Sequence, residues 1–460
     1  MADTKTILQQ LRDYESRNIT FMEADGSWPI VWARAKGVHV WDAAGKRYLD
    51  LTAAFGVAAA GHANPAVVRA GQKQMGTLLH AMGDVHPHAL KAQLAQELSR
   101  LTFERWNAAA FVRTRQTSSA STKRISRTRT SAATGKVIFC NSGFEAVEAA
   151  LKTAIRFTGK SRIIAFQGAY HGLGYGALNA THREHFRAAF RPQLRQFGQF
   201  LPFPSARKEL SPLTKRIREL LRTKTVGAIL VEPIQVRGGI NIPPQGFLPQ
   251  LRKLCDEHGV LLVLDEIYTG FGRTGKWFAC EHTDITPDLI CLGKALTGGF
   301  PLSTCVGRAD IMNAAWPPSD GEAIHTSTFL GHPVGCAMAL AQIRELQRRK
   351  LCERSARLGA ILLTRLQRLS SPSTSFRYEA RGLGLLVGLE LHQANGVPAT
   401  ALALRVIKAM LQRGYILLPE GEHSNVISLT PPLTISEAQL AKTVRTLETC
   451  LRAAIAETKP

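Results

Sequence analysis

The hydrophobic pattern of the chain is dominated by short, uninterrupted apolar runs that end in small or polar residues. Runs of this kind are typical of strands that are buried on both faces, as in a parallel sheet. They cover residues 136–140, 162–166, 226–231, 261–264 and 289–292. Helical patterns cover residues 65–79, 87–101, 143–158, 334–350, 401–413 and 437–456. The sequence therefore predicts an α/β fold with a mostly parallel sheet.

The two ends of the chain show a different pattern. Near the N-terminus, apolar and polar residues alternate around a glycine turn, which is typical of a small antiparallel sheet. Near the C-terminus, short strands alternate with helices. We expect the two ends to pack together as one discontinuous small domain. The predicted domains are residues 1–67 and 341–460 for the small domain and residues 68–340 for the large domain.

One stretch of the predicted large domain does not fit this pattern. Residues 106–134 are rich in Ser, Thr, Ala and Arg, with six basic residues and no acidic ones. Low hydrophobicity combined with high net charge disfavours a packed core. The sequence therefore predicts a basic, flexible and solvated insertion here.

Composition narrows the function classes. No run of about twenty apolar residues is present, so no membrane-spanning helix is expected, and the polar N-terminus lacks the apolar core of a signal peptide. The eight cysteines are scattered without metal-ligand or disulfide spacing. We therefore expect no metal site and a reducing, cytoplasmic setting.

The charge balance is strongly basic. The chain has 58 basic and 35 acidic residues, a formal net charge of +23. Such a balance is found in nucleic-acid-binding proteins, but here the excess is spread along the chain and no nucleic-acid-binding motif accompanies it. We expect no nucleic-acid partner and interpret the basic surface as one that attracts anionic substrates and cofactor.

Two residues with catalytic potential follow neighbouring apolar runs. Asp265 comes directly after residues 261–264, and Lys294 follows residues 289–292 after a single glycine. In open α/β sheets, ligands bind beyond the carboxyl ends of the strands. The sequence therefore predicts that Asp265 and Lys294 lie at the same edge of the sheet.

A carboxylate and a desolvated lysine are the groups that pyridoxal phosphate requires. The lysine amine forms a Schiff base with the aldehyde, and the carboxylate pairs with the pyridinium nitrogen and keeps it protonated. Desolvation lowers the pKa of a lysine and makes its neutral amine available as a nucleophile. The alternative, a surface lysine in a turn, is disfavoured by the apolar strand before Lys294.

The stretch from residue 261 to 301, LLVLDEIYTGFGRTGKWFACEHTDITPDLICLGKALTGGFP, resembles the signature of class III aminotransferases. These are fold-type I pyridoxal-phosphate enzymes that include ornithine, gamma-aminobutyrate and omega-amino-acid transaminases. The resemblance runs from about residue 28 to the C-terminus, with the insertion as a gap. It implies a mostly parallel seven-stranded sheet in the large domain and an α+β small domain. Arg273, in the glycine-rich loop of this stretch, is expected to hold that loop by hydrogen bonds.

The resemblance also implies a set of cofactor-binding residues. Ser142, Gly143 and the N–H of Phe144 open a helix, where backbone N–H groups and the helix dipole favour a phosphate. Tyr170 is expected to stack on one face of the cofactor ring, and Ile267 to pack on the other.

Further residues are assigned by the same resemblance. His171 is expected to line the site or to hold its loop, and Glu232 to fix Asp265 or an adjacent water. Gln235 matches a position near the phenolic oxygen of the cofactor. The segment that contains Phe55 borders the substrate pocket.

The chain departs from the family pattern at Arg237, where gamma-aminobutyrate-type enzymes have a glutamate that pairs with a distant arginine. That arginine matches Arg381. Two arginines repel each other unless an anion lies between them, so our hypothesis is that Arg237 and Arg381 bind a substrate carboxylate jointly, or that Arg237 points elsewhere. Position 268 is also unusual, because Tyr268 stands where a smaller or amide side chain is expected.

Thr328 matches a threonine that binds the cofactor phosphate of the neighbouring subunit. The resemblance therefore implies a homodimer in which both active sites lie at the interface.

The function implied is that of a ping-pong transaminase, which moves an amino group from an amine or amino acid to a 2-oxo acid through Lys294. An aminomutase, a racemase or a decarboxylating transaminase would use the same lysine, aspartate and phosphate-binding residues. A basic binding protein with a degenerate enzyme fold is the alternative from another class. The sequence does not name the amino donor or decide between pyruvate and 2-oxoglutarate as the acceptor.

Overall fold

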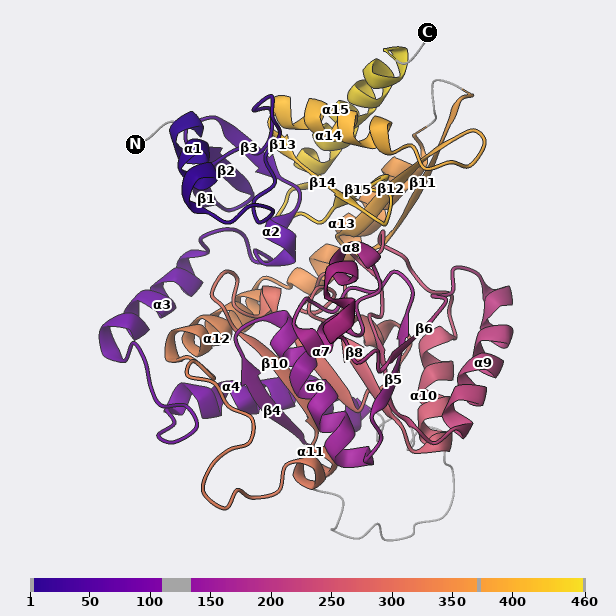
Figure 1. Ribbon diagram of the computed structural model, residues 1–460. Helices are drawn as coiled ribbons and strands as arrows, with labels where there is room; N and C mark the ends of the chain where they lie inside the picture. The colour runs from indigo at the N-terminus through magenta and orange to yellow at the C-terminus, as the bar shows by residue number, and fades with distance from the viewer. Residues whose placement is uncertain (1–3, 110–133, 370–373, 458–460) are drawn as a thin grey trace, which may run out of the picture.

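The computed structural model describes residues 4–109, 134–369 and 374–457. Figure 1 shows two bodies, a lower one built on a large sheet and an upper one that contains both ends of the chain. Most of the predicted insertion, residues 110–133, lies outside the described residues. The insertion was predicted to start at Trp106. In the structure, Trp106 is instead buried against Phe103 and Phe278 and belongs to the core.

The lower body is built on a seven-stranded sheet with the order β4-β10-β9-β8-β7-β5-β6. β10 runs antiparallel to both of its neighbours, and the pairs from β9 to β6 are parallel. This confirms the predicted α/β fold. The strands are β4 (Gly135–Cys140), β5 (Arg162–Phe166), β6 (Gly198–Leu201), β7 (Val226–Val231), β8 (Leu261–Asp265), β9 (Leu289–Leu292) and β10 (Ser303–Arg308).

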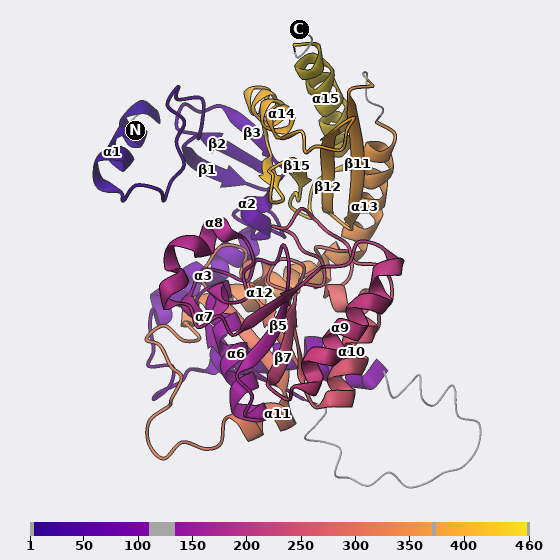
Figure 2. The same cartoon turned by 45° about the vertical axis from the view of Figure 1, so that its right-hand side comes forward.

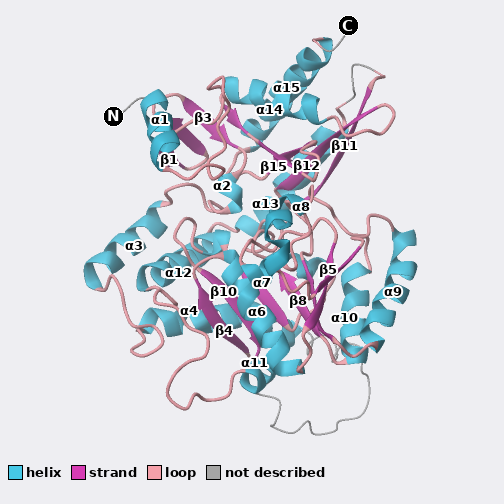
Figure 3. Ribbon diagram, in the orientation of Figure 1, coloured by secondary structure: helices cyan, strands magenta, loops and turns pink. Residues whose placement is uncertain are grey.

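Helices cover both faces of this sheet (Figures 2 and 3). The helices of the lower body are α3 (Pro65–Thr77), α4 (Ala89–Ser99), α6 (Gly143–Thr158), α7 (Tyr175–Leu178), α8 (Glu184–Arg187), α9 (Leu210–Arg222), α10 (Phe247–His258), α11 (Ala309–Ala315) and α12 (Pro333–Arg348). The central strands are buried on both sides: in β8, Leu262 and Leu264 belong to one core cluster, whereas Leu261 and Val263 belong to another. The uninterrupted apolar runs of the sequence arise from this two-sided burial.

The upper body contains two smaller sheets, with strand orders β1-β2-β3-β13 and β11-β12-β15-β14. The parallel pairing of β3 with β13 joins the N-terminal segment to the C-terminal one. The strands are β1 (Trp32–Lys36), β2 (His39–Asp42), β3 (Arg47–Asp50), β11 (Phe376–Leu383), β12 (Leu386–Gln393), β13 (Tyr415–Ile416), β14 (Leu418–Glu420) and β15 (Val426–Leu429). The helices are α1 (Thr4–Tyr14), the single turn α2 (Ala53–Gly56), α13 (Leu351–Gln367), α14 (Thr400–Gln412) and α15 (Glu437–Ala456). Among the described residues, no helix has both the length and the apolar character that a membrane crossing requires.

A buried arginine connects the two bodies. Arg273 is 1% exposed, and its guanidinium donates hydrogen bonds to the carbonyl groups of Leu385, at 3.0 Å, and Pro431, at 2.6 Å. The hydroxyl of Ser355 donates to the carbonyl of Arg273 at 2.9 Å. Burial lowers the pKa of Arg273 to about 10. Arg273 therefore anchors its glycine-rich loop to the upper body, in agreement with the prediction that it holds this loop.

We expect Arg273→Met to destabilise the protein by about 3 kcal/mol, because the substitution leaves two buried carbonyl groups without donors. For a chain of this length, that loss lowers Tm by about 3 °C. Differential scanning calorimetry measures the shift. Arg216→Met is the control, because Arg216 is 61% exposed and its replacement should move Tm by less than about 1 °C. Equal shifts for the two variants would contradict the anchoring role.

Candidate active site

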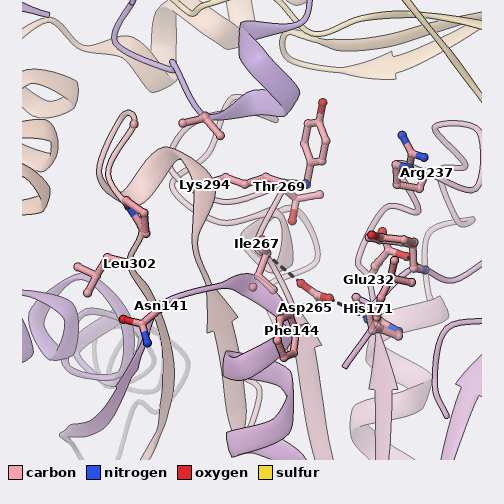
Figure 4. Close-up of a pocket in the computed structure, with 18 of the residues that line it drawn as sticks. Asn141, Phe144, His171, Glu232, Arg237, Asp265, Ile267, Thr269, Lys294 and Leu302 are labelled. Atoms are coloured by element: carbon pink, nitrogen blue, oxygen red, sulfur yellow. Dashed lines mark hydrogen bonds and ion pairs between the residues drawn. The ribbon is translucent and has the colours of Figure 1, made fainter. Parts of the chain in front are cut away.

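A cavity of about 550 Å³ lies at the carboxyl edge of the seven-stranded sheet. Its wall includes residues that follow several strands, because parallel strands direct their carboxyl ends to one edge. Figure 4 shows these side chains around the cavity. The wall is formed by Val57, Asn141, Gly143, Phe144, Tyr170, His171, Gly172, Leu173, Glu232, Arg237, Asp265, Ile267, Tyr268, Thr269, Lys294, Gly299, Phe300, Pro301 and Leu302.

Lys294 enters the cavity from the loop after β9, as the sequence predicted. Its backbone adopts a positive φ of 43°, an uncommon conformation for a residue other than glycine. The ammonium lies 3.7 Å from the centroid of the Tyr268 ring. Desolvation lowers the pKa of Lys294 to about 8, while the charges of Asp265 and Glu232 oppose that shift. A larger fraction of this lysine is therefore neutral near pH 7 than of an exposed lysine.

Asp265 ends β8 and is held by two contacts. One carboxylate oxygen lies 2.8 Å from Nδ1 of His171, and the other accepts the N–H of Ile267 at 3.1 Å. Asp265 is 5% exposed, and His171 is buried as well. The opposite ring nitrogen of His171, Nε2, is buried and has no hydrogen-bond partner in the described part of the chain. His171 therefore both lines the cavity and fixes the orientation of the Asp265 carboxylate.

Glu232, directly after β7, is a second buried carboxyl group in the cavity wall. It accepts the N–H groups of Tyr170, at 2.9 Å, and Val236, at 3.2 Å. Desolvation raises its pKa to about 7; the charge of Asp265 adds to this rise, and that of His171 opposes it. Glu232 therefore holds the loop of Tyr170 in place and can carry a proton at neutral pH.

The start of α6 forms one corner of the cavity. Gly143 and Phe144 line it, and the carboxylate of Glu145 accepts the N–H of Asn141 at 2.6 Å. A Cβ atom on Gly143 would meet the side chain of Ile267 at 3.2 Å, so a larger residue there would push against the cavity wall. The hydroxyl of Ser142 is buried and has no hydrogen-bond partner among the described residues.

Two apolar or aromatic surfaces contribute to the same cavity. Tyr170 and Ile267 both line it, and the Tyr170 ring packs edge-on against Phe186, with 5.5 Å between centroids. The positive φ of Gly172 (102°) turns the chain after His171, and a Cβ atom there would meet the Cβ of Phe144 at 2.3 Å. Glycine is therefore required at position 172 for the loop of Tyr170 to pack against α6.

Ser142, Phe55, Thr328, Gln235 and Arg381 are predicted site residues that lie outside the cavity wall, and the last two are engaged by backbone carbonyl groups. Gln235 is 1% exposed, and its amide donates to the carbonyl of Gln167 at 2.7 Å. The guanidinium of Arg381 donates to the carbonyl groups of Gly239 and Ile240, and it pairs with Glu390. Gln235 therefore connects its loop to Gln167, and Arg381 holds the backbone of Gly239 and Ile240. The prediction that Arg381 faces Arg237 is therefore wrong.

The group that faces Arg237 is Glu420, the last residue of β14. The two charged groups approach to 3.6 Å, with Arg237 28% exposed and Glu420 2% exposed. The guanidinium of Arg237 also lies 5.6 Å from the centroid of the Tyr170 ring. Arg237 lines the cavity, so the alternative hypothesis that it points elsewhere is not supported.

Two other expected residues are exposed. Phe55 is 48% exposed and lies in a left-handed stretch, with a φ of 59°, so that Val57 rather than Phe55 reaches the cavity. Thr328 is exposed and is not part of this cavity wall.

Sequence reasoning missed several residues of the wall, and it left Tyr268 without an explanation. The Tyr268 ring contacts Lys294, and its hydroxyl lies 3.3 Å from that of Thr430. Phe300, Pro301 and Leu302 close another side of the cavity. The only sequence signal for Phe300 and Pro301 was that they end the stretch that resembles the family signature, and Leu302 directly follows that stretch.

Comparisons with known proteins agree with this geometry. The family model described as Aminotransferase class-III matches residues 21–451. An acetylornithine aminotransferase from Methanopyrus kandleri is 36% identical over 94% of this chain and 97% of that protein. A putrescine aminotransferase from Pectobacterium atrosepticum is 35% identical over 93% of this chain and 83% of that protein. The structure of an ornithine aminotransferase from Toxoplasma gondii has a TM-score of 0.80 and 26% sequence identity, and the match covers 99% of this chain and 95% of that chain. That structure is described as having partial occupancy of PLP at its active site.

Proposed function

Because the chain belongs to the class III aminotransferase family, we propose that Lys294 and Asp265 are its catalytic residues and that the cavity of about 550 Å³ is its active site. The protein is a pyridoxal-phosphate-dependent aminotransferase with an α/β fold. One observation carries the assignment of the two residues: a buried aspartate at the end of β8 and a desolvated lysine just after the adjacent parallel strand β9 line one cavity.

The residues present fit pyridoxal phosphate. A phosphate at the start of α6 would meet backbone N–H groups and the positive end of the helix dipole. The buried Ser142 hydroxyl has no partner among the described residues, so it is free to donate to a phosphate oxygen. Tyr170 and Ile267 line the space in which the ring would lie, and Asp265 would hold its nitrogen. When bound, the cofactor supplies an aldehyde and an electron-withdrawing ring.

The remaining chemistry belongs to residues of the chain. The neutral amine of Lys294 would remove a proton from the donor carbon that bears the amino group, and it would later return that proton. Asp265 would keep its negative charge opposite the ring nitrogen, with its orientation fixed by His171. Glu232 would hold the loop that contains Tyr170. Arg237 is the cavity residue that we assign to binding a substrate carboxylate.

The lowered pKa of Lys294 makes a testable prediction. Since only the neutral amine is nucleophilic, the rate at which added pyridoxal phosphate attaches covalently to the cofactor-free enzyme should rise about tenfold per pH unit below pH 8. It should level off above the Lys294 pKa of about 8. Stopped-flow absorbance measures this rate. A rate that continues to rise up to pH 10 would show that Lys294 titrates like an exposed lysine.

The experiment that tests the function is a visible absorption spectrum of the holoenzyme, recorded before and after addition of a panel of amines and amino acids. A donor should convert the bound cofactor to its amine form, and a 2-oxo acid should reverse the change. Product analysis separates transamination from the reactions of an aminomutase, a racemase or a decarboxylating transaminase. Products of these other reactions, without amino-group transfer to any 2-oxo acid, would overturn the transaminase assignment.

We also propose that the enzyme is a homodimer with shared active sites. Exposed apolar side chains gather on two segments that the contact of His80 with Phe329 brings together, at 5.3 Å between ring centroids. They are Leu78, Leu79, Met82, Val85, Ile324 and Phe329, each at least 39% exposed. Exposed apolar side chains on neighbouring segments favour an interface. The position of Thr328 within it supports the proposal that this residue reaches the partner's phosphate. Light scattering that gives a monomer mass would refute this proposal.

We further propose a reducing, cytoplasmic setting and retain the predicted domain division. All eight cysteines lie in described residues and are buried and free, which suits a reducing compartment. The pairing of β3 with β13 supports a small domain that is formed by both ends of the chain. Fractionation of the source cells tests the first proposal, and limited proteolysis tests the second.

A further inference from the structure

The ring of Tyr268 is the surface on which the Lys294 amine lies. Its centroid is 3.7 Å from the Lys294 nitrogen, within the range of a cation–π contact, which strengthens when water is excluded. Both side chains line the cavity, and Tyr268 is 8% exposed. Among the described residues, the Lys294 side chain has no hydrogen bond or ion pair. In that part of the chain, the ring is therefore the group that contacts the amine directly.

The upper body holds this ring in place through two contacts. The hydroxyl of Thr430, directly after β15, donates to the carbonyl of Thr52 at 3.2 Å. Its oxygen can therefore accept the hydroxyl of Tyr268, which is 3.3 Å away. The ring also packs on Gly56 of α2, where a Cβ atom would be 2.8 Å from ring atom Cε1. These contacts fix the orientation in which the ring faces Lys294.

The Tyr268 hydroxyl takes no part in acid–base chemistry near neutral pH. Desolvation raises the pKa of Tyr268 to about 12, and the charge of Glu420 adds to the rise. The hydroxyl therefore keeps its proton and its hydrogen bond to Thr430. What Tyr268 offers to Lys294 is the face of its ring.

Four charged groups act on the Lys294 amine at longer range. Desolvation is the main cause of the lowered pKa of Lys294, and Arg237 adds to it. The carboxylates of Asp265, Glu232 and Glu420 oppose the shift. None of these carboxylates forms an ion pair with Lys294. They set the local potential, but they do not determine where the amine lies.

Given the aminotransferase function proposed above, on which this inference rests, we propose that Tyr268 is a positioning residue that holds the Lys294 amine on its ring face whenever that amine is not joined to the cofactor. From this position the amine takes the proton of the donor carbon: the C–H bond breaks, its electron pair passes into the cofactor ring, and an N–H bond forms. The ring face then holds the ammonium until the proton is returned. Tyr268 stands where a smaller or amide side chain was expected, and such a side chain offers no ring face.

The test is the pH titration of the Lys294 amine in the full-length chain freed of cofactor. Trace labelling with acetic anhydride, followed by peptide mass spectrometry, measures it because only the neutral amine reacts. In the wild type, labelling should reach half its maximum at about pH 8. In Tyr268→Leu this midpoint should fall by about one pH unit, because the ring no longer stabilises the ammonium. In Tyr268→Phe, which keeps the ring, it should move by less than about 0.3 pH unit.

Lys276 is the internal reference, because it is exposed on the loop after β8 and is labelled in the same samples. Its labelling profile should be the same in all three proteins. Should Tyr268→Leu fail to fold, Tyr268→Met carries the test, because methionine fills irregular space and has no ring.

Kinetics of the holoenzyme give a second readout. In Tyr268→Leu, kcat should fall about tenfold, and Tyr268→Phe, the conservative variant, should recover most of that loss. With a donor deuterated at the carbon that bears the amino group, the isotope effect on kcat should be larger in Tyr268→Leu than in the wild type. The reason is that a less well placed amine removes the proton more slowly.

An unchanged labelling midpoint in Tyr268→Leu would overturn the proposal, because a ring that only packs in the cavity wall does not affect the titration of Lys294. Equal shifts in Tyr268→Leu and Tyr268→Phe would also overturn it, because they would assign the effect to the hydroxyl. The labelling does not depend on turnover. An enzyme that transaminates no amine would therefore refute the proposed function, whereas a lowered midpoint confined to Tyr268→Leu would still support the role of the ring.

Discussion

Replacement of Lys294 by alanine should lower kcat on the order of 10⁴-fold or more. Lys294 is assigned two tasks, because its amine links the cofactor to the chain and also moves the proton of the donor carbon. General acid–base catalysis alone contributes about 10²- to 10⁴-fold, and loss of the nucleophile adds to that. Steady-state kinetics with the best donor from the amine panel measures the loss.

A covalent readout accompanies the kinetics. Borohydride reduction of the wild-type holoenzyme, followed by peptide mass spectrometry, should place the cofactor on the peptide that contains Lys294. The Lys294→Ala variant should carry no such adduct. Lys276→Ala is the matched control: Lys276 is exposed and lies on the loop after β8, so both kcat and the adduct should be unchanged. An adduct on another lysine of the variant, with kcat within tenfold of wild type, would refute the assignment.

The fold, and the meeting of Asp265 and Lys294 at one cavity, were predictable because burial leaves a strong pattern. Strands such as β7 and β8 are buried on both faces, so they appear as uninterrupted apolar runs, and the residue after each run marks the active edge. β6 and β10 were missed for physical reasons. β6 is only partly buried at the edge of the sheet, and β10 contains Ser, Thr and Gly among its apolar residues.

Helix α13 was missed for a different reason. It begins directly after Lys350, which breaks the preceding helix with a left-handed φ of 48°. Lysine carries no sequence signal for such a break, because left-handed residues are usually glycine or asparagine.

The charged residues near the candidate site were the least predictable part. Arg381 matched a family arginine, but its side chain is used by the carbonyl groups of Gly239 and Ile240. Glu420 gave no signal, because its partner Arg237 is distant in sequence and the two meet only where the bodies join. A strand pattern indicates which residues are buried, but it does not indicate which long side chain turns toward a cavity.

Asp265→Asn should lower kcat on the order of 10³-fold, because a fixed charge in a desolvated site stabilises the transition state far more than it would in water. Asparagine has nearly the same shape as aspartate. Its side-chain oxygen can still accept the hydrogen bond from the N–H of Ile267, which measures 3.1 Å with Asp265. It removes the negative charge that would keep the ring nitrogen of the cofactor protonated. The measurement is kcat at saturating donor and pyridoxal phosphate, with the bound cofactor quantified after dialysis.

The control for Asp265→Asn is Asp288→Asn, which removes a buried aspartate from the opposite edge of the sheet. Asp288 precedes β9, is 2% exposed and pairs with Arg252 and Arg308. Its replacement should lower Tm, because two arginines lose their partner, while kcat should stay within a few-fold of wild type. Asp265→Asn should show the reverse, with a large loss of kcat and a small change in Tm. If Asp265→Asn lowered Tm as much as the control and left kcat within tenfold of wild type, Asp265 would be a structural residue. The negative charge opposite the ring nitrogen would then have to come from another carboxylate, and Glu232 is the other carboxylate that lines the described cavity.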